Sequence, residues 1–142
     1  MQWPRLDSSL AVWSQAAALR AEIVTWVGDR VLGPIGPEDV ALTHGGQNAI
    51  HLILDCCLRG ERPAVLIEEL AYPGFRYAAR AARADVVAVE IDAMGIVPEA
   101  LEAACKRHAA QVLCLSTEAQ NPTTGRMPFE RRTAIADLAR RY

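Results

Sequence analysis

The stretch AVLIEELAYPGFRYAARAARADVVAVE, residues 64–90, contains two apolar runs separated by a run of helical composition. The apolar runs at 64–68 and 86–90 are rich in Val, Leu and Ile, which is typical of strands that are buried on both faces. The segment from Gly74 to Arg83 favours a helix, and a strand–helix–strand unit of this kind joins parallel strands. These residues therefore predict part of a parallel sheet that is covered by helices.

The same alternation continues on both sides of this unit. Further strands are predicted at 40–43 and 111–115, and further helices at 47–59, 98–107 and 128–141. Strands that alternate with helices are typical of α/β proteins. The sequence therefore predicts an α/β fold with three layers, α/β/α, around a largely parallel sheet.

The beginning of the chain follows a different pattern. Apolar residues at mixed three- and four-residue spacing predict a long amphipathic helix from about Ser9 to Arg30. The segment LGPIGP at 32–37 then interrupts any regular element, because its glycines and prolines favour turns. We therefore divide the chain into an N-terminal helix and Gly/Pro loop, residues 1–38, and an α/β part, residues 39–142.

Composition excludes several classes of function for this segment. A length of 142 residues corresponds to one domain or to a piece of a larger one, and 51% hydrophobic residues are enough for a packed core. The net charge of -2 lacks the basic excess that nucleic-acid binding requires, and no apolar run approaches the roughly 20 residues that span a membrane. Four cysteines without secretory or metal-site spacing indicate a reduced, cytoplasmic location and no metal site.

Two pairs of reactive side chains have simple interpretations. Glu68 and Glu69 do not form an acid–base pair, because consecutive strand residues point to opposite faces. Cys56 and Cys57 are expected to be small core residues of a helix.

Three turns are candidates for ligand binding, since ligands in such sheets bind where strands end and helices begin. Gly45, Gly46 and Gln47 open a predicted helix, whose first N–H groups attract an anion such as phosphate. Tyr72 precedes a proline and can present a flat face to an aromatic ligand, and the Asn121 amide can donate a hydrogen bond. Taken singly, each also has a simpler interpretation, as an ordinary turn or as a half-buried packing residue.

Taken together and in this order, the three turns resemble the cofactor-binding part of fold-type I pyridoxal-phosphate (PLP) enzymes of the class I/II aminotransferase family. The resemblance rests on GGQ at 45–47, YPG at 72–74 and NPTTG at 121–125, and it covers nearly the whole chain. It implies the N-terminal part of the large domain of a PLP-dependent transferase. Asn-Pro-Thr-Thr followed by Glu-Arg-Arg at 130–132 is most similar to the aminotransferase-like domain of MocR-type regulators of the GntR superfamily.

The resemblance also implies a role for each residue of the candidate cofactor site. The amides of Gly46 and Gln47, in the turn that begins at Gly45, would hold the phosphate of PLP. Tyr72 would stack on the pyridine ring, and Asn121 would donate to the phenolic oxygen. PLP is therefore the expected cofactor, bound non-covalently in this chain.

The lysine that forms the Schiff base in this family is absent from the position that the resemblance implies. It lies well downstream of the Asn-Pro turn, whereas this chain has a single lysine, Lys106. We expect Lys106 to be solvated and to lie at the opposite edge of the sheet, because it ends a predicted helix that precedes a strand. Full-length relatives transfer amino groups through a lysine aldimine, but we assign no catalytic residue here and expect no catalysis from the chain alone.

The sequence leaves three functions open. In the first, the chain is the PLP-binding segment of an aminotransferase-like protein. In the second, it is the effector-sensing part of a MocR-type regulator that binds PLP or an amino acid as its effector. In the third, it is a truncated, non-catalytic remnant that only self-associates. Under each of them we expect a homo-oligomer, most simply a dimer, because part of a large domain leaves apolar faces and a sheet edge uncovered.

Overall fold

The computed structural model describes residues 7–28 and 33–142. The chain divides into two compact units between His44 and Gly45. Our division of the chain after residue 38 stays a prediction.

The first unit consists of a long helix and a short one. Helix α1 spans Asp7–Val27, and the 3-10 helix η1 spans Pro37–Asp39. The predicted N-terminal helix is thus confirmed up to Val27, and its expected end at 29–30 lies outside the described residues.

The predicted strand at 40–43 is wrong. These residues adopt no strand, and none of the described strands pairs with them. A strand requires backbone hydrogen bonds to a neighbouring strand, and no described strand supplies them here. Leu42 is also exposed, so the apolar run is not buried as a strand of the core would be. The turn at Gly45 and Gly46 consequently opens a helix without following a strand.

The second unit contains a sheet of three parallel strands. These are β1 (Ala64–Glu68), β2 (Asp85–Val89) and β5 (Val112–Cys114), in the order β2-β1-β5. Strand β1 is central and is buried along its whole length. The three strands and their parallel direction agree with the sequence prediction, apart from one or two residues at the ends of β2 and β5.

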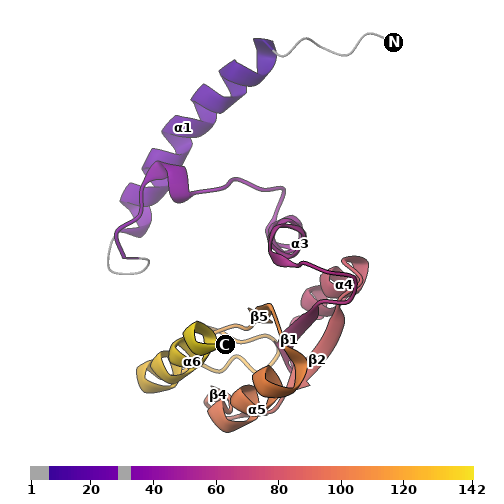
Figure 1. The fold of residues 1–142 in the computed structure, drawn as a ribbon. Helices are drawn as coiled ribbons and strands as arrows, with labels where there is room; N and C mark the ends of the chain where they lie inside the picture. Colours follow the sequence, from indigo (N-terminus) through magenta and orange to yellow (C-terminus); the bar gives the residue numbers. More distant parts are fainter. Residues whose placement is uncertain (1–6, 29–32) are drawn as a thin grey trace. The chain divides into compact units, whose positions relative to one another are not determined.

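Helices cover both faces of this sheet. Their bounds are α3 Gly46–Cys57, α4 Pro73–Ala81, α5 Pro98–His108 and α6 Phe129–Arg141. Helices α3 and α4 lie on one face, and α5 and α6 lie on the other (Figure 1). Side chains of β1 alternate accordingly: Val65 and Ile67 pack in the core under α3 and α4, and Leu66 packs in the core under α5 and α6. The predicted α/β/α layers are therefore confirmed.

One small element was missed at the sequence level. Strands β3 (Ile91–Asp92) and β4 (Gly95–Ile96) form a hairpin between β2 and α5. Arg131 of α6 holds this hairpin, with Nη2 3.0 Å from Asp92 Oδ2 and Nη1 donating to the Ile96 carbonyl oxygen at 2.7 Å. The hydrogen bond from Arg131 keeps the pKa of Asp92 below its ordinary value.

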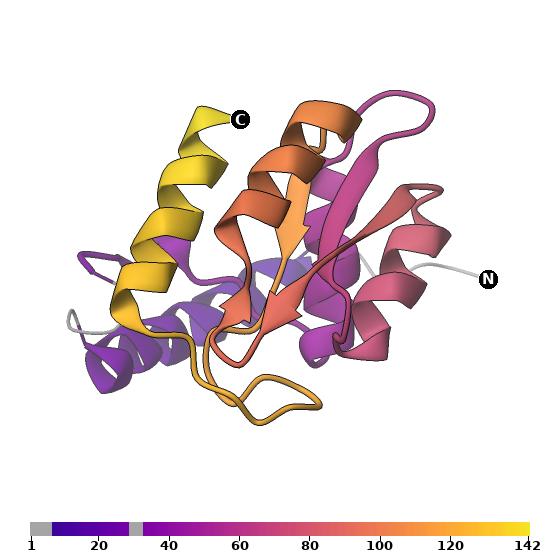
Figure 2. The same ribbon diagram turned by 90° about the horizontal axis from the view of Figure 1, so that it is seen from below.

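The topology brings three separate segments to one edge of the sheet. Because the strands are parallel, the loops that follow β1 and β5 leave from the same edge. The loop after β5 extends beyond the sheet there (Figure 2). Helix α3 runs back toward the start of β1, so its first turn also lies at this edge.

No helix within residues 7–28 and 33–142 combines the length and the apolar character that crossing a membrane requires.

We expect Ile67→Ala to lower the free energy of unfolding by about 2–5 kcal/mol, because Ile67 has no exposed surface and the substitution leaves a cavity in the central strand. Leu52→Ala is the matched control: Leu52 lies on α3 and is 47% exposed, so its loss changes the free energy by no more than about 0.5 kcal/mol. Urea denaturation followed by circular dichroism measures both. Equal effects of the two substitutions would contradict the central position of β1.

Candidate functional site

The first turns of α3 and α4 are in direct contact. Gln47 Nε2 donates to the Gly74 carbonyl oxygen at 3.1 Å. A Cβ atom added at Gly74 would lie 2.0 Å from Tyr72 Cε1 and 2.1 Å from Gln47 Oε1. The tyrosine ring and the glutamine amide therefore both lie against Gly74, where only a glycine leaves room for them. Two of the three sequence-predicted turns are thus brought together.

The turn at Gly45 has room for a ligand. Gly45 has φ 89°, a conformation that suits glycine, and as the N-cap of α3 it supplies no side-chain cap. An added Cβ at Gly45 or Gly46 would meet no atom within 4 Å, so a ligand can approach the backbone closely. The first N–H groups of a helix have no partner within the helix and attract anions. Gly46 and Gln47 therefore fit a phosphate group.

Tyr72 is partly exposed at the start of α4. It is the N-cap of α4, which begins with a proline at the first helical position, and 38% of its surface is accessible. Its ring contacts Phe75 edge-on, with ring centroids 6.0 Å apart and an interplanar angle of 84°. The ring therefore packs against Phe75 and Gly74, and part of its surface remains available to a flat ligand.

Asn121 lies in the loop between β5 and α6, and it is exposed. Arg132 of α6 holds the base of this loop, because its Nε donates to the Met127 carbonyl oxygen at 2.8 Å and its guanidinium pairs with Glu118. The Glu-Arg-Arg segment at 130–132 is thus structural: Arg131 holds the β3–β4 hairpin and Arg132 holds the loop that carries Asn121.

A buried polar pair lies beneath the two exposed loops. Glu68, the last residue of β1, has no exposed surface, and Gln120 is only 3% exposed. Glu68 Oε2 accepts from the Ser116 N–H at 3.1 Å and from Gln120 Nε2 at 3.3 Å. Gln120 also donates to the Leu70 carbonyl oxygen and accepts from the Thr123 N–H. The pair connects the end of the central strand with the loops of Tyr72 and Asn121.

The surroundings of Glu68 raise the pKa of its carboxyl group. Burial raises the pKa of its carboxyl group, and the hydrogen bonds from Gln120 and Ser116 oppose this increase with a smaller effect. Both hydrogen bonds end on Oε2, whereas Oε1 is buried without a hydrogen-bond partner among the described residues. An unpartnered carboxylate oxygen costs much more in such a place than a neutral carboxyl group.

The sequence reasoning missed both members of this pair. It treated Glu68 only as half of an excluded acid–base pair, and it treated Gln120 only as a neighbour of the Asn-Pro turn. The available signal was the position of Glu68: a carboxyl group at the end of a strand that is apolar on both faces must be buried with a polar partner.

Lys106 lies away from these loops. It occupies the last turn of α5, where the chain returns toward the start of β5, and its Nζ is 3.0 Å from Glu102 Oε1. Its side chain is 57% exposed, as expected for a solvated lysine. The hydrogen bond to Glu102 raises the pKa of Lys106, which keeps the amine charged.

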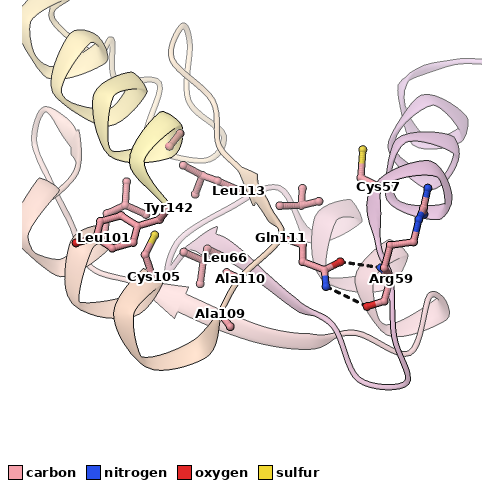
Figure 3. A pocket seen from close by; sticks show the side chains of 12 residues that line it. Cys57, Arg59, Leu66, Leu101, Cys105, Ala109, Ala110, Gln111, Leu113 and Tyr142 are labelled. Atoms are coloured by element: carbon pink, nitrogen blue, oxygen red, sulfur yellow. Dashed lines mark hydrogen bonds between the residues drawn. The ribbon is translucent and has the colours of Figure 1, made fainter.

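The expectation for Cys56 and Cys57 is wrong. Both residues are exposed, because they lie on the outer face of α3 and the core-facing position of this turn belongs to Leu54. A cavity of about 630 Å³, lined in part by Cys57 and Cys105, lies at the opposite edge from the candidate site (Figure 3). None of the five sequence-predicted cofactor residues lines it.

The sequence matches the family Aminotransferase class I and II over residues 11–142. It is 34% identical over 138 residues to the Aminotransferase swnA of Metarhizium robertsii, covering 92% of this chain and 27% of that protein. It is also 32% identical over 106 residues to the HTH-type transcriptional regulator YdeF of Bacillus subtilis, covering 74% of this chain and 22% of YdeF.

The fold is similar to that of a solved aminotransferase. The crystal structure of LysN, the α-aminoadipate aminotransferase of Thermus thermophilus complexed with N-(5'-phosphopyridoxyl)-L-leucine, matches with a TM-score of 0.75 and 30% identity. The match covers 88% of this chain and 30% of LysN. This chain therefore spans less than a third of the length of these three proteins.

Gly74→Ala should destabilise the chain by about 1–3 kcal/mol, because its Cβ displaces the Tyr72 ring or the Gln47 amide. Gly46→Ala is the control: its Cβ meets no atom within 4 Å, and we expect a gain of about 0.4–1 kcal/mol. Thermal unfolding measures both, and near-UV circular dichroism reports the tyrosine ring. A stabilising Gly74→Ala would disprove the contact.

Glu68→Gln should change the pH dependence of stability. The pKa of Glu68 is raised above 4.5 in the folded chain, so the stability linked to its bound proton is fully present below pH 4.5 and is lost as the pH rises through the raised pKa. The amide keeps the hydrogen-bond acceptor but does not titrate. The variant should therefore gain stability relative to the wild type as the pH increases from about 4 to 8. Urea denaturation at several pH values tests this, and a pH-independent difference between the two proteins would contradict the burial of an acid.

Proposed function

The chain belongs to the class I and II aminotransferase family, and from this premise we propose that residues 45–142 bind PLP non-covalently at the carboxyl edge of the sheet. One observation carries the proposal. The first turn of α3, the Tyr72 loop and the Asn121 loop lie at one sheet edge and are connected by the Gln47–Gly74 and Gln120–Leu70 hydrogen bonds. A phosphate-binding turn, an exposed aromatic ring and an exposed amide at one edge suit a flat, phosphorylated ligand.

The phosphate would bind at the start of α3. The N–H groups of Gly46 and Gln47 supply donors, and the helix dipole favours a negative charge. Gly45 has a positive φ, which suits glycine, and the absence of side chains at Gly45 and Gly46 leaves the backbone open to close approach. The side chain of Gln47 is already engaged by Gly74, so only its backbone amide is assigned to the phosphate.

The ring would lie between the loops of Tyr72 and Asn121. The partly exposed ring of Tyr72 stacks on the pyridine ring of PLP. The Asn121 amide donates a hydrogen bond to the phenolic oxygen of PLP, and this favours the ionised form of that oxygen. The similarity to LysN, solved with a phosphopyridoxyl compound, supports this choice of ligand.

PLP supplies an electron sink for reactions at the α-carbon of amino acids. This chain supplies binding and orientation, and we assign it no catalytic residue. Its single lysine is paired with Glu102 in the last turn of α5, at the other edge from the proposed site. We therefore propose that the chain alone does not catalyse amino-group transfer.

The similarity to YdeF favours a second function. In this alternative the chain is part of the effector-sensing domain of a transcriptional regulator, and it reads PLP or an amino acid. Both functions use the same site, so ligand binding does not distinguish them. The reading frame of the gene distinguishes them: a DNA-binding segment encoded with this domain supports the regulator, and a reading frame without such a segment supports the enzyme.

We also propose that the chain forms a dimer and resides in the cytoplasm. Apolar side chains such as Trp26 of α1 and Phe129 of α6 are exposed, at 86% and 78%, which favours self-association. All four cysteines are free, as expected in a reducing compartment. Sedimentation velocity tests the dimer. A monomer at all concentrations would also exclude the third alternative, a remnant that only self-associates.

The test of PLP binding uses equilibrium dialysis and the visible absorbance of PLP with the 142-residue chain. We expect saturable binding and, after borohydride reduction, no specific covalent adduct by intact mass. Lys106→Arg should bind equally well, because the site does not use this amine. Absence of saturable binding would overturn the proposed function, and a stoichiometric adduct at Lys106 would overturn its placement.

Tyr72→Ala provides the residue-level test. Loss of one aromatic stacking contact should weaken PLP binding by about 3- to 10-fold. Tyr77→Ala is the matched control, because Tyr77 lies on α4 close to Tyr72 in sequence and is 66% exposed but is not assigned to the site. Equal affinities of the two variants would remove Tyr72 from the site.

A further inference from the structure

Gln120 uses its whole hydrogen-bonding capacity. Its Nε2 group donates to Glu68 Oε2 at 3.3 Å and to the Leu70 carbonyl oxygen. Its Oε1 atom accepts from the Thr123 N–H at 2.9 Å and from Thr123 Oγ1 at 2.6 Å. A side-chain amide offers two donor hydrogens and two acceptor lone pairs, so every one of them is occupied.

The partners of Gln120 belong to three different parts of the fold. Leu70 lies two residues before Tyr72, and Thr123 lies two residues after Asn121. Glu68 ends the fully buried central strand. One side chain therefore connects the loop of the stacking ring, the loop of the amide donor and the core.

Glu68 is the partner that connects Gln120 to the core. Its Oε2 atom also accepts from the Ser116 N–H at 3.1 Å, just beyond β5. The carboxyl group thus lies between the ends of two neighbouring strands, where it has no exposed surface. A shift of the Asn121 loop would break the hydrogen bonds from Ser116 and Gln120 to Glu68, and a shift of the Tyr72 loop would break the hydrogen bond from Gln120 to Leu70.

The two loops need such a connection, because their own residues are exposed. Leu70 is 52% exposed and Tyr72 is 38% exposed, and Asn121 is exposed as well. Exposed loops with few buried contacts open easily. A flat ring that contacts Tyr72 on its face and Asn121 at its edge requires a constant spacing between them.

We propose that Gln120, anchored on Glu68, is a positioning residue that holds the Tyr72 and Asn121 loops at the spacing that the PLP ring requires. This inference rests on the proposed PLP site and deepens it. Gln120 acts through Leu70 and Thr123 and does not touch the ligand. A glutamate at this position would lack both donors, and an asparagine would be one methylene group shorter.

The test compares Gln120→Ala with a matched glutamine at the other end of the sheet. Gln111 also bridges two segments, because its Oε1 accepts from the Arg59 N–H at 2.7 Å and its Nε2 donates to the Arg59 carbonyl oxygen at 3.0 Å (Figure 3). Gln111→Ala removes two hydrogen bonds of an exposed glutamine far from the proposed site, and so controls for loss of an amide that bridges two segments. Unchanged exchange of the β1 amides in Gln120→Ala controls for a general loss of stability, because Gln120 is buried and makes four hydrogen bonds.

Two measurements on the 142-residue chain give the result. Hydrogen exchange followed by mass spectrometry should show faster exchange for Gln120→Ala in both loops, around residues 69–75 and 116–126, and Gln111→Ala should leave both loops unchanged. Equilibrium dialysis with PLP should show affinity weakened by about tenfold for Gln120→Ala, as when a bound group loses an outer hydrogen-bond partner. Gln111→Ala should bind PLP like the wild type.

The outcomes separate this inference from the proposed function. No PLP binding by the wild-type chain overturns the proposed function, and the positioning role for PLP with it. Wild-type binding that Gln120→Ala leaves unchanged overturns only the positioning role. Faster exchange in one loop but not in the other also overturns it, because the inference requires that one side chain holds both.

Discussion

Complete burial of β1 is the constraint on which the rest of this fold depends. Its side chains alternate between two cores, so α3 and α4 must cover one face of the sheet and α5 and α6 the other. The neighbouring strands β2 and β5 pair with it in parallel, and both connections pass over the sheet as helices. A strand surrounded in this way has no access to water at its end, and Glu68 stands at that end. The same burial that stabilises the sheet therefore determines the environment of the carboxyl group at the end of β1.

The buried carboxyl group makes the strand end a fixed point for the loops above it. A solvated glutamate would bond to water and leave both loops independent. Burial instead requires donors from the protein, and the Ser116 N–H and the Gln120 amide supply them. Because Gln120 must then satisfy its own remaining donor and its acceptor oxygen, it takes partners from both loops. The order of the exposed site thus follows from polar satisfaction in the core.

Local patterns in the sequence were sufficient for the layers of the fold. The apolar runs at 64–68 and 86–90 and the proline at the start of α5 predicted their elements closely, because burial on both faces leaves a strong pattern. The strand at 40–43 was predicted wrongly, since an apolar run of four residues does not show whether a partner strand exists. The candidate site residues could be predicted because they lie in turns with recognisable sequence motifs. Glu68 and Gln120 were missed because their hydrogen bond joins residues that are 52 positions apart. A contact of that kind leaves no periodic signal in a single sequence.

The exposed and buried parts of the site have different physical requirements. In the proposed site, Gly46, Gln47, Tyr72 and Asn121 would present groups to PLP, so each needs only the right type of donor or surface and a turn that exposes it. Glu68 and Gln120 must satisfy every polar atom without water, except for the buried Oε1 of Glu68, which a neutral carboxyl group tolerates better than a carboxylate. Under the proposed function, a change of type at an exposed position would alter one contact with PLP. A change at Gln120 removes four hydrogen bonds that connect the two loops, so under the proposed positioning role it would alter the geometry of the site more than a change at any single group that faces the ligand.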